Sequence, residues 1–139
     1  MFETPKGVIK PIVYVGIVRG SELLMVDYVN APNPGKQGWW IPAPGLEFGG
    51  DPRATALKTV QEFGFTSQDI SLHDVESFVT PGGWHLIYHF RCQVKGEPTA
   101  HANVREYRWV DEKDLNALPN VAHGRWEVGI GQSYLDSSL

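Results

Sequence analysis

Residues 38–65, GWWIPAPGLEFGGDPRATALKTVQEFGF, decide the fold predicted for this chain of 139 residues. Asp51 places a side-chain acceptor at an N-cap, and Pro52 follows at the first helical position, where a missing N–H costs nothing. Gly64 supplies a stop signal at the other end. The stretch therefore predicts a loop, a helix over residues 52–63 and a second loop.

The residues before this stretch have the composition of strands. Residues 8–18 and 22–29 are rich in β-branched and aromatic side chains, and Arg19-Gly20-Ser21 separates them, which is typical of a hairpin. Pro11 cannot donate to a ladder and is expected near a strand end or edge. The turn-rich residues 30–37 then lead to a short strand at 39–41.

The residues after the stretch continue the alternation of strands and helices. Strands are predicted at 70–80, 84–95 and 105–110, and helices at 111–117 and 123–135, the last one interrupted by Gly129 and Gly131. The order of strands, helix, strands and helix suits a mixed sheet with helices on both faces. The predicted fold class is therefore α/β, as an α/β/α sandwich.

Composition bounds the function. With 42% apolar and 20% charged residues, residues 1–139 are expected to form one domain. The formal charge of −4 and the isolated basic residues argue against a polymeric nucleic acid partner. Cys92 is the only cysteine, so no intramolecular disulfide forms, which suits a reducing compartment. The apolar runs are too short to cross a bilayer and no secretion signal precedes them, so a soluble cytoplasmic protein is expected.

The segment IPAPGLEFGG, at residues 41–50, resembles part of the Nudix box, in which Pro-Gly-Gly-any-any-Glu-any-Gly-Glu precedes a helix. The matching residues are Pro42, Glu47 and Gly49. Ala43 and Pro44 replace the paired glycines, and Gly50 replaces the first box glutamate. REYRWVDEKDL, at 105–115, also looks like a Nudix tail. The resemblance covers roughly the whole chain and implies a Nudix-like α/β/α sandwich with a mixed central sheet.

This sequence differs most from the family pattern in the helix that binds the metal. In the family, acids at i, i+3 and i+4 line one helix face and hold a divalent cation. Counted back from Gly64, these positions are Lys58, Gln61 and Glu62, with Leu57 in the arginine position. Counted forward from Glu47, they are Thr59, Glu62 and Phe63, with Lys58 in the arginine position. Both registers keep Glu62 alone.

The resemblance therefore implies a metal site with fewer carboxylate ligands than the family normally has. It implies Mg²⁺, or Mn²⁺, held by Glu62 with help from Glu47 and the backbone carbonyl near Ala43, because magnesium needs few protein carboxylates when substrate phosphates complete its shell. Alternatively, Glu62 is a solvated residue that pairs with Lys58, a contact of about 0.2–0.5 kcal/mol. A third hypothesis is that the Lys58 ammonium replaces the charge of the metal ion and binds a diphosphate without metal.

One branch of the family, the GDP-mannose mannosyl hydrolases, is similar in having lost box carboxylates. Its helix resembles LKTVQEFG, with a threonine three residues before a surviving glutamate and a glycine two after it, which correspond to Thr59, Glu62 and Gly64. That branch uses a histidine base from a later loop, and here residues 96–105 offer His101. The alternative is that His101 is an ordinary surface-loop histidine.

Further residues are candidates for ligand contacts. Gly49 and Gly50 precede a helix N-terminus, which favours anions, so they and Lys58 are expected to bind phosphate. Trp40, with Trp39 and Phe78, is a candidate for stacking a nucleobase, although packing under the loops explains these aromatics equally well.

Two histidines on one strand invite a metal interpretation. His85 and His89 lie at i, i+4 of a predicted strand, so they face the same side about 13 Å apart, too far to share a metal ion. One is expected to line a pocket, and the other to be structural or exposed.

Two functions follow from the resemblance. The first is a diverged Nudix hydrolase that cleaves a small nucleoside diphosphate derivative, in particular a nucleotide sugar, with Glu62 and His101 as catalytic residues and divalent-metal help. The alternative is a catalytically inactive Nudix-fold module that binds a nucleotide or a protein. Family members often pair, so a homodimer is a further expectation.

Overall fold

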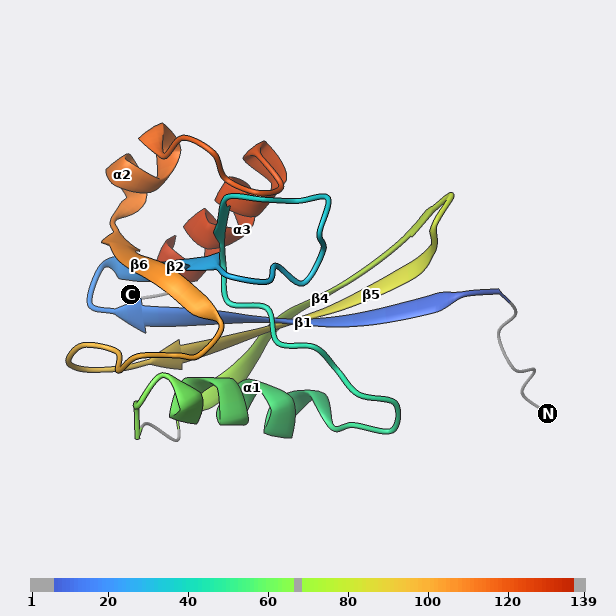
Figure 1. Cartoon of the computed structure of the whole chain (residues 1–139), viewed down its shortest axis with the longest axis horizontal. Coiled ribbons are helices and arrows are strands. Elements are labelled where there is room, and N and C mark those ends of the chain that lie inside the picture. The colour runs from blue at the N-terminus through green and yellow to red at the C-terminus, as the bar shows by residue number, and fades with distance from the viewer. Residues whose placement is uncertain (1–6, 67–68, 137–139) are drawn as a thin grey trace.

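The computed structural model describes residues 7–66 and 69–136, which build one mixed sheet between helices (Figure 1). The described strands follow the order β3-β2-β1-β5-β4, and β6 pairs with β2. Helix α1 covers one face and helices α2 and α3 cover the other (Figure 1). The predicted α/β/α sandwich with a mixed central sheet is confirmed.

A fork between the first two strands carries the chain toward the helix. Strands β1 (Ile9–Arg19) and β2 (Glu22–Tyr28) form the predicted hairpin, but their residues pair only next to the turn. Beyond it the strands diverge, and β3 (Trp39–Trp40) pairs with β2 inside the fork. On the other side, the Val15 N–H donates to the Pro42 carbonyl at 2.9 Å. Residues 43–50 therefore leave the sheet from its middle.

The remaining strands extend the sheet on both sides. Strand β5 (Gly83–Gln93) runs parallel to β1, and β4 (Ile70–Thr80) pairs antiparallel with β5 as an edge strand. Strand β6 (Val104–Val110) pairs antiparallel with β2. All three agree with the predicted ranges to within two residues. Pro11 lies where β1 pairs with β5 alone, so one side of it is free of a ladder, as predicted.

The first helix begins where its cap predicts. In α1 (Pro52–Glu62), Asp51 Oδ2 accepts the Ala54 N–H at 3.1 Å, and Gly64 after the helix has a left-handed φ of 86°. Helices α2 (Glu112–Ala117) and α3 (Arg125–Asp136) lie on the other face. The predicted break in α3 does not occur. Gly131 faces the core, where an added Cβ would lie 2.8 Å from Leu115 Cδ2, so a larger residue there would require the leucine side chain to shift.

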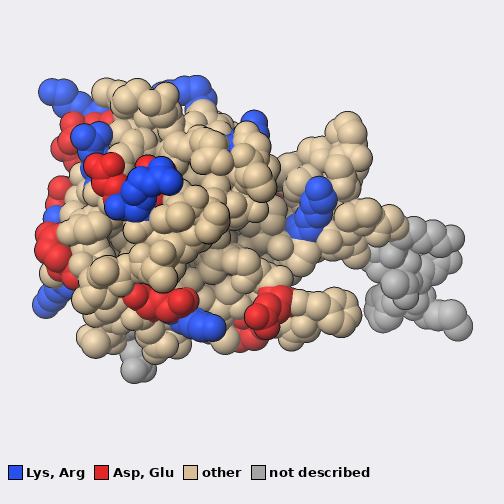
Figure 2. All heavy atoms as spheres, viewed as in Figure 1, with Lys and Arg blue, Asp and Glu red and all other residues tan. Residues whose placement is uncertain are grey.

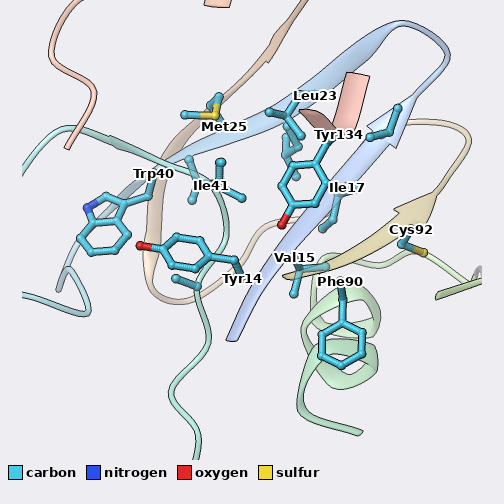
Figure 3. Close-up of a cluster of buried hydrophobic side chains, with 14 of the residues drawn as sticks. Tyr14, Val15, Ile17, Leu23, Met25, Trp40, Ile41, Phe90, Cys92 and Tyr134 are labelled. Carbon is cyan, nitrogen blue, oxygen red and sulfur yellow. The ribbon is translucent and has the colours of Figure 1, made fainter. Parts of the chain in front are cut away.

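The core lies between the sheet and the helices on both faces, and Figure 3 shows side chains of β1, β2, β3, β5 and α3 meeting there. Tyr134 of α3 is fully buried over Gly16, where an added Cβ would lie 2.5 Å from the ring. This close approach seats α3 against β1. Within the described residues, no helix has the length and apolar character needed to cross a membrane.

Candidate functional site

A cavity of about 360 Å³ opens between α1, the loop at residues 43–45 and the residues that precede β6. We call it the polar cavity. It is lined on the helix side by Thr55, Lys58, Thr59 and Glu62, and opposite by Ala43, His101 and Asn103. Four of the residues predicted as site residues, Lys58, Glu62, His101 and Ala43, are thus brought together.

Helix periodicity puts a cation and an anion on the same wall. Lys58 and Glu62 are four residues apart in α1 and both face the polar cavity. No ion pair joins them, and no other described residue hydrogen-bonds or pairs with the Lys58 ammonium. The Glu62 side chain is 49% exposed. Both charges are therefore available to a ligand.

His101 approaches Glu62 from the opposite wall. Its Nε2 lies 4.0 Å from Glu62 Oε2, and its ring lies against Phe63 with centroids 4.8 Å apart. His101 Nδ1 accepts the Asn103 N–H at 3.1 Å. A nitrogen that accepts carries no proton, so in the neutral ring Nε2 bears the hydrogen and directs it toward Glu62.

The loop that carries His101 is fixed at several points. The Thr99 N–H donates to the Phe63 carbonyl at 2.7 Å, beside the end of α1. Glu97 accepts hydrogen bonds from Trp109 Nε1, at 3.1 Å, and from Arg19, whose guanidinium lies 4.1 Å over the Trp109 ring. The hydrogen bond from Arg19 lowers the pKa of Glu97. These contacts hold His101 in place before any ligand binds.

The far wall of the polar cavity is equally constrained. Tyr28 Oη accepts the Ala43 N–H at 2.8 Å, and burial raises the pKa of Tyr28 to about 12. The Asn103 side chain accepts the Asn30 N–H at 2.8 Å and donates to the Asn30 carbonyl at 3.0 Å. The end of β2 and the start of β6 are thereby joined beside the cavity.

The residues present do not fit a divalent metal centre. Nowhere in residues 7–66 and 69–136 do three His, Cys, Asp or Glu side chains gather so that they could hold a metal ion. Glu47 is exposed, in a turn in which the Gly50 N–H donates to the Glu47 backbone carbonyl at 2.8 Å. Its side chain does not line the polar cavity. Among the described residues, Glu62 is thus the only carboxylate lining it, with Lys58 one turn away. An ammonium beside a lone carboxylate opposes Mg²⁺ or Mn²⁺ binding.

Gly49 and Gly50, also predicted to contact phosphate, lie exposed in the same turn before α1. Neither lines the polar cavity. Their proposed role stays a prediction.

A second cavity of about 760 Å³ adjoins the first, and the two share the wall at residues 43–45. We call it the aromatic cavity, because its lining includes the rings of Tyr14, Trp40, Phe78, His85, His123 and Trp126. Trp40 and Phe78 were predicted for such a role. Trp39 points elsewhere, with the Arg108 guanidinium 5.7 Å from its ring.

One corner of the aromatic cavity is built on a buried acid that the sequence did not single out. Glu127 is fully buried, and its carboxylate accepts the Ile41 N–H and lies 2.8 Å from His123 Nδ1. His123 in turn meets Trp40 edge-on, with centroids 4.7 Å apart. An acid on the same helix face as Gly131 and Tyr134 was the available signal, since a charged residue inside an apolar stripe needs partners.

The two histidines of β5 have separate roles, as predicted. His85 lines the aromatic cavity, with Nε2 2.8 Å from Thr80 Oγ1. His89 is 1% exposed, with Nε2 2.6 Å from Glu76 Oε1 and Nδ1 3.2 Å from the Tyr134 hydroxyl. His89 therefore belongs to the core.

The surface seen in Figure 2 shows acidic and basic side chains interspersed, with no continuous basic stripe.

Comparison with known proteins identifies the fold. No protein-family model matches the chain, and no curated protein matches it in sequence. A Nudix-family hydrolase from Clostridium perfringens matches with a TM-score of 0.70 at 14% identity, over 91% of this chain and 96% of that one. The NUDIX domain of Shewanella oneidensis NrtR, complexed with ADP ribose, matches with a TM-score of 0.74 at 14% identity, over 96% and 91%.

A MutT protein from Methanosarcina mazei Go1 matches with a TM-score of 0.72, also at 14% identity, over 96% of this chain and 97% of that one. The chain therefore has the Nudix hydrolase fold, as the resemblance implied. These matches do not single out the GDP-mannose branch.

Proposed function

We propose that this Nudix-fold chain binds a small nucleoside diphosphate derivative, such as a nucleotide sugar, across its two adjoining cavities. The observation that carries the proposal is the unpaired Lys58 ammonium in the polar cavity, one loop away from a cavity lined by aromatic rings. A diphosphate needs cationic charge and an attached nucleoside needs a flat apolar surface. The two cavities supply these side by side.

Lys58 takes the place of a metal ion in this proposal. Lysine binds phosphate as a point charge, and of the polar cavity's described lining residues Glu62 is the single acid beside it. The solved complex of the Shewanella oneidensis NrtR NUDIX domain with ADP ribose supports the ligand class, because ADP ribose is itself a nucleoside diphosphate derivative.

Isothermal titration calorimetry with ADP-ribose, GDP-mannose and UDP-glucose, each with EDTA and with Mg²⁺, tests the proposal. At least one compound should bind with unchanged affinity in EDTA. Lys58→Met should weaken that binding roughly 10- to 100-fold, the range of one hydrogen bond to a charged group. Lys113→Met, on exposed α2, is the matched control and should bind as the wild type does.

Two outcomes contradict the proposal. Absence of binding by all three compounds rejects the ligand class, and loss of binding in EDTA rejects the metal-free role of Lys58.

Hydrolysis is a second candidate function, favoured by the 4.0 Å separation of His101 Nε2 and Glu62 Oε2. Because His101 Nδ1 already accepts a hydrogen bond, its Nε2–H faces Glu62 and cannot also take a proton. In this candidate, Glu62 is the base that removes a proton from the attacking water, and His101 positions the carboxylate. Attack of the water on phosphorus would break the P–O–P bridge and release a nucleoside monophosphate and a sugar phosphate. Attack on the sugar carbon would break the C–O bond and release the nucleoside diphosphate and the free sugar.

A release assay for nucleoside monophosphate with sugar phosphate, and for free sugar, separates the two candidates. Under the hydrolysis candidate, Glu62→Gln abolishes turnover, whereas Glu112→Gln on α2 leaves it intact. Turnover that survives in Glu62→Gln removes Glu62 from the reaction. Binding without turnover of any compound leaves the chain as a binding module.

A further inference from the structure

The aromatic cavity has a size and lining suited to a flat organic group. It measures about 760 Å³, and its walls come from separate elements. Half-buried Trp126 of α3 forms one, and the exposed Phe78, stacked on half-buried His85 of the β4–β5 hairpin, forms another. The Phe78 and His85 rings lie 4.9 Å apart and 13° from parallel. Rings on both sides suit a planar ligand, which gains contact area on both faces.

Within this apolar lining, Tyr14 offers a polar group without a partner. Its residue is 3% exposed, and its ring is enclosed by Trp40, His89 and Trp126, with centroids 5.7–6.5 Å away. No described residue hydrogen-bonds to its hydroxyl. Figure 3 shows the hydroxyl end of the ring turned toward Trp40. A tyrosine this deeply buried normally hydrogen-bonds its hydroxyl.

The hydroxyl opens into the aromatic cavity rather than into a sealed core. Among the described residues, every fully enclosed side-chain nitrogen or oxygen has a hydrogen-bond partner. Because the Tyr14 hydroxyl has none, its oxygen must reach accessible space, and the space that Tyr14 lines is the aromatic cavity. Burial raises the pKa of Tyr14, so the hydroxyl keeps its proton and can both donate and accept.

The surroundings of Tyr14 are rigid. The Trp40 ring that lies beside it is held by a hydrogen bond from Nε1 to the Lys36 carbonyl at 3.0 Å. His123, edge-on to Trp40, is held by Glu127, which is itself anchored to the Ile41 N–H. The hydroxyl is therefore presented in a fixed position, which favours recognition of one particular edge of a ligand.

We propose that the aromatic cavity receives the nitrogen heteroaromatic ring of the ligand and that the Tyr14 hydroxyl is the specificity-determining group that hydrogen-bonds to the ring's polar edge. This inference rests on the proposed binding of a nucleoside diphosphate derivative and names the residue that selects its ring. A ring nitrogen or carbonyl accepts from the hydroxyl, or an exocyclic amine donates to it. A purely hydrocarbon ring would leave the hydroxyl unpaired.

The test compares Tyr14→Phe with the wild type, using the tightest binder among ADP-ribose, GDP-mannose and UDP-glucose and, separately, inorganic pyrophosphate. Tyr14→Phe should weaken the nucleotide roughly 3- to 10-fold, the effect of one neutral hydrogen bond, and leave pyrophosphate unchanged. Lys58→Met should weaken both probes. Tyr88→Phe, at a tyrosine of β5 that lines neither cavity, is the matched control and should bind both as the wild type does.

A thermal melt separates recognition from structural damage. Because the Tyr14 hydroxyl has no hydrogen-bond partner in residues 7–66 and 69–136, Tyr14→Phe should melt no lower than the wild type. A lower melting temperature, equal weakening of pyrophosphate, or unchanged nucleotide affinity each overturns the inference about Tyr14. Failure of all three nucleotides to bind overturns the proposed function as well, so the two failures are distinct.

Discussion

Helices α1 and α3 cover opposite faces of one sheet and border different cavities, yet they are specified differently. Helix α1 carries its own start and stop in Asp51 and Gly64 and buries only Ala56, Thr59 and Val60. Helix α3 buries five residues, including the acid Glu127 and the glycine Gly131. The first is defined mainly by local signals, and the second by residues far away in the chain.

This difference separates binding from stability. Lys58 and Glu62 face the polar cavity from α1 without supporting the core, so changing them should alter ligand binding and leave the fold intact. In α3, Glu127 contacts His123 at the aromatic cavity and also accepts the N–H of Ile41, the residue after β3. The same side chain therefore supports the cavity and holds β3 between β1 and β2. A change there should damage the fold and the cavity together.

The largest expected effect is therefore on α3, from Glu127→Ala. The substitution leaves the buried Ile41 N–H without its acceptor and the half-buried His123 Nδ1 without its partner. We expect the free energy of unfolding, measured by urea titration, to fall by about 3–5 kcal/mol. The control, Glu112→Ala in exposed α2, should lie within about 0.5 kcal/mol of the wild type.

If Glu127→Ala lowers the free energy of unfolding by less than about 1 kcal/mol, the effect is no larger than that of losing one helix cap. The claim that α3 depends more than α1 on distant contacts would then be wrong.

The second prediction asks whether the end of α1 depends on distant residues too. Gly64 has a φ of 86°, and an added Cβ would lie 2.6 Å from Thr99 Cγ2. Gly64→Ala should lower the free energy of unfolding by about 2 kcal/mol, from left-handed strain and from contact with the loop that carries His101. Thr99→Ala in the same background should restore only the contact part.

A double-mutant cycle on Gly64 and Thr99 measures that part as the coupling energy. Zero coupling would mean that α1 ends on backbone conformation alone.

The same contrast explains how far the sequence could be read. The cap of α1, the hairpin of β1 and β2, and the cavity-facing positions of Lys58 and Glu62 follow from spacing within a few residues. His101 could be named as a candidate, but its distance from Glu62 depends on Glu97 contacts with Arg19 and Trp109, which join three separate segments. Local periodicity contains no such information.

The aromatic cavity was harder to predict from the sequence, because it too depends on contacts between residues far apart in the chain. Trp39 and Trp40 are neighbours of similar chemistry, and only the register of β3 on β2 decides that Trp40 lines the cavity. The contact between Glu127 and the Ile41 N–H spans 86 residues of sequence. The predicted break at Gly129 and Gly131 was wrong because tertiary packing on Leu115 and Leu23 outweighs the low helix propensity of glycine.

The third prediction concerns the start of α1. Asp51→Ala removes the acceptor of the Ala54 N–H and should lower the free energy of unfolding by about 1 kcal/mol. Asp51→Asn, which keeps a capping oxygen, is the control and should lose at most a few tenths of that. If Asp51→Ala destabilises as much as Glu127→Ala does, α1 is not the locally specified helix that the comparison describes.

The smallest expected effect is a pH dependence on the α3 face. His73 Nε2 lies 3.1 Å from Ser133 Oγ of α3, and burial, followed by the nearby His89 and Arg91, lowers the pKa of His73 despite Asp74 beside it. The unfolded chain therefore binds this proton more readily, and stability falls as pH drops through about 6.5 toward the lower folded value. His73→Gln should flatten the urea midpoint between pH 7 and pH 5.5 relative to the wild type. If the urea midpoints of the two proteins change equally with pH, burial beside α3 does not disfavour protonation of His73. Glu127 and Tyr134 would then be the contacts that hold the helix against the sheet.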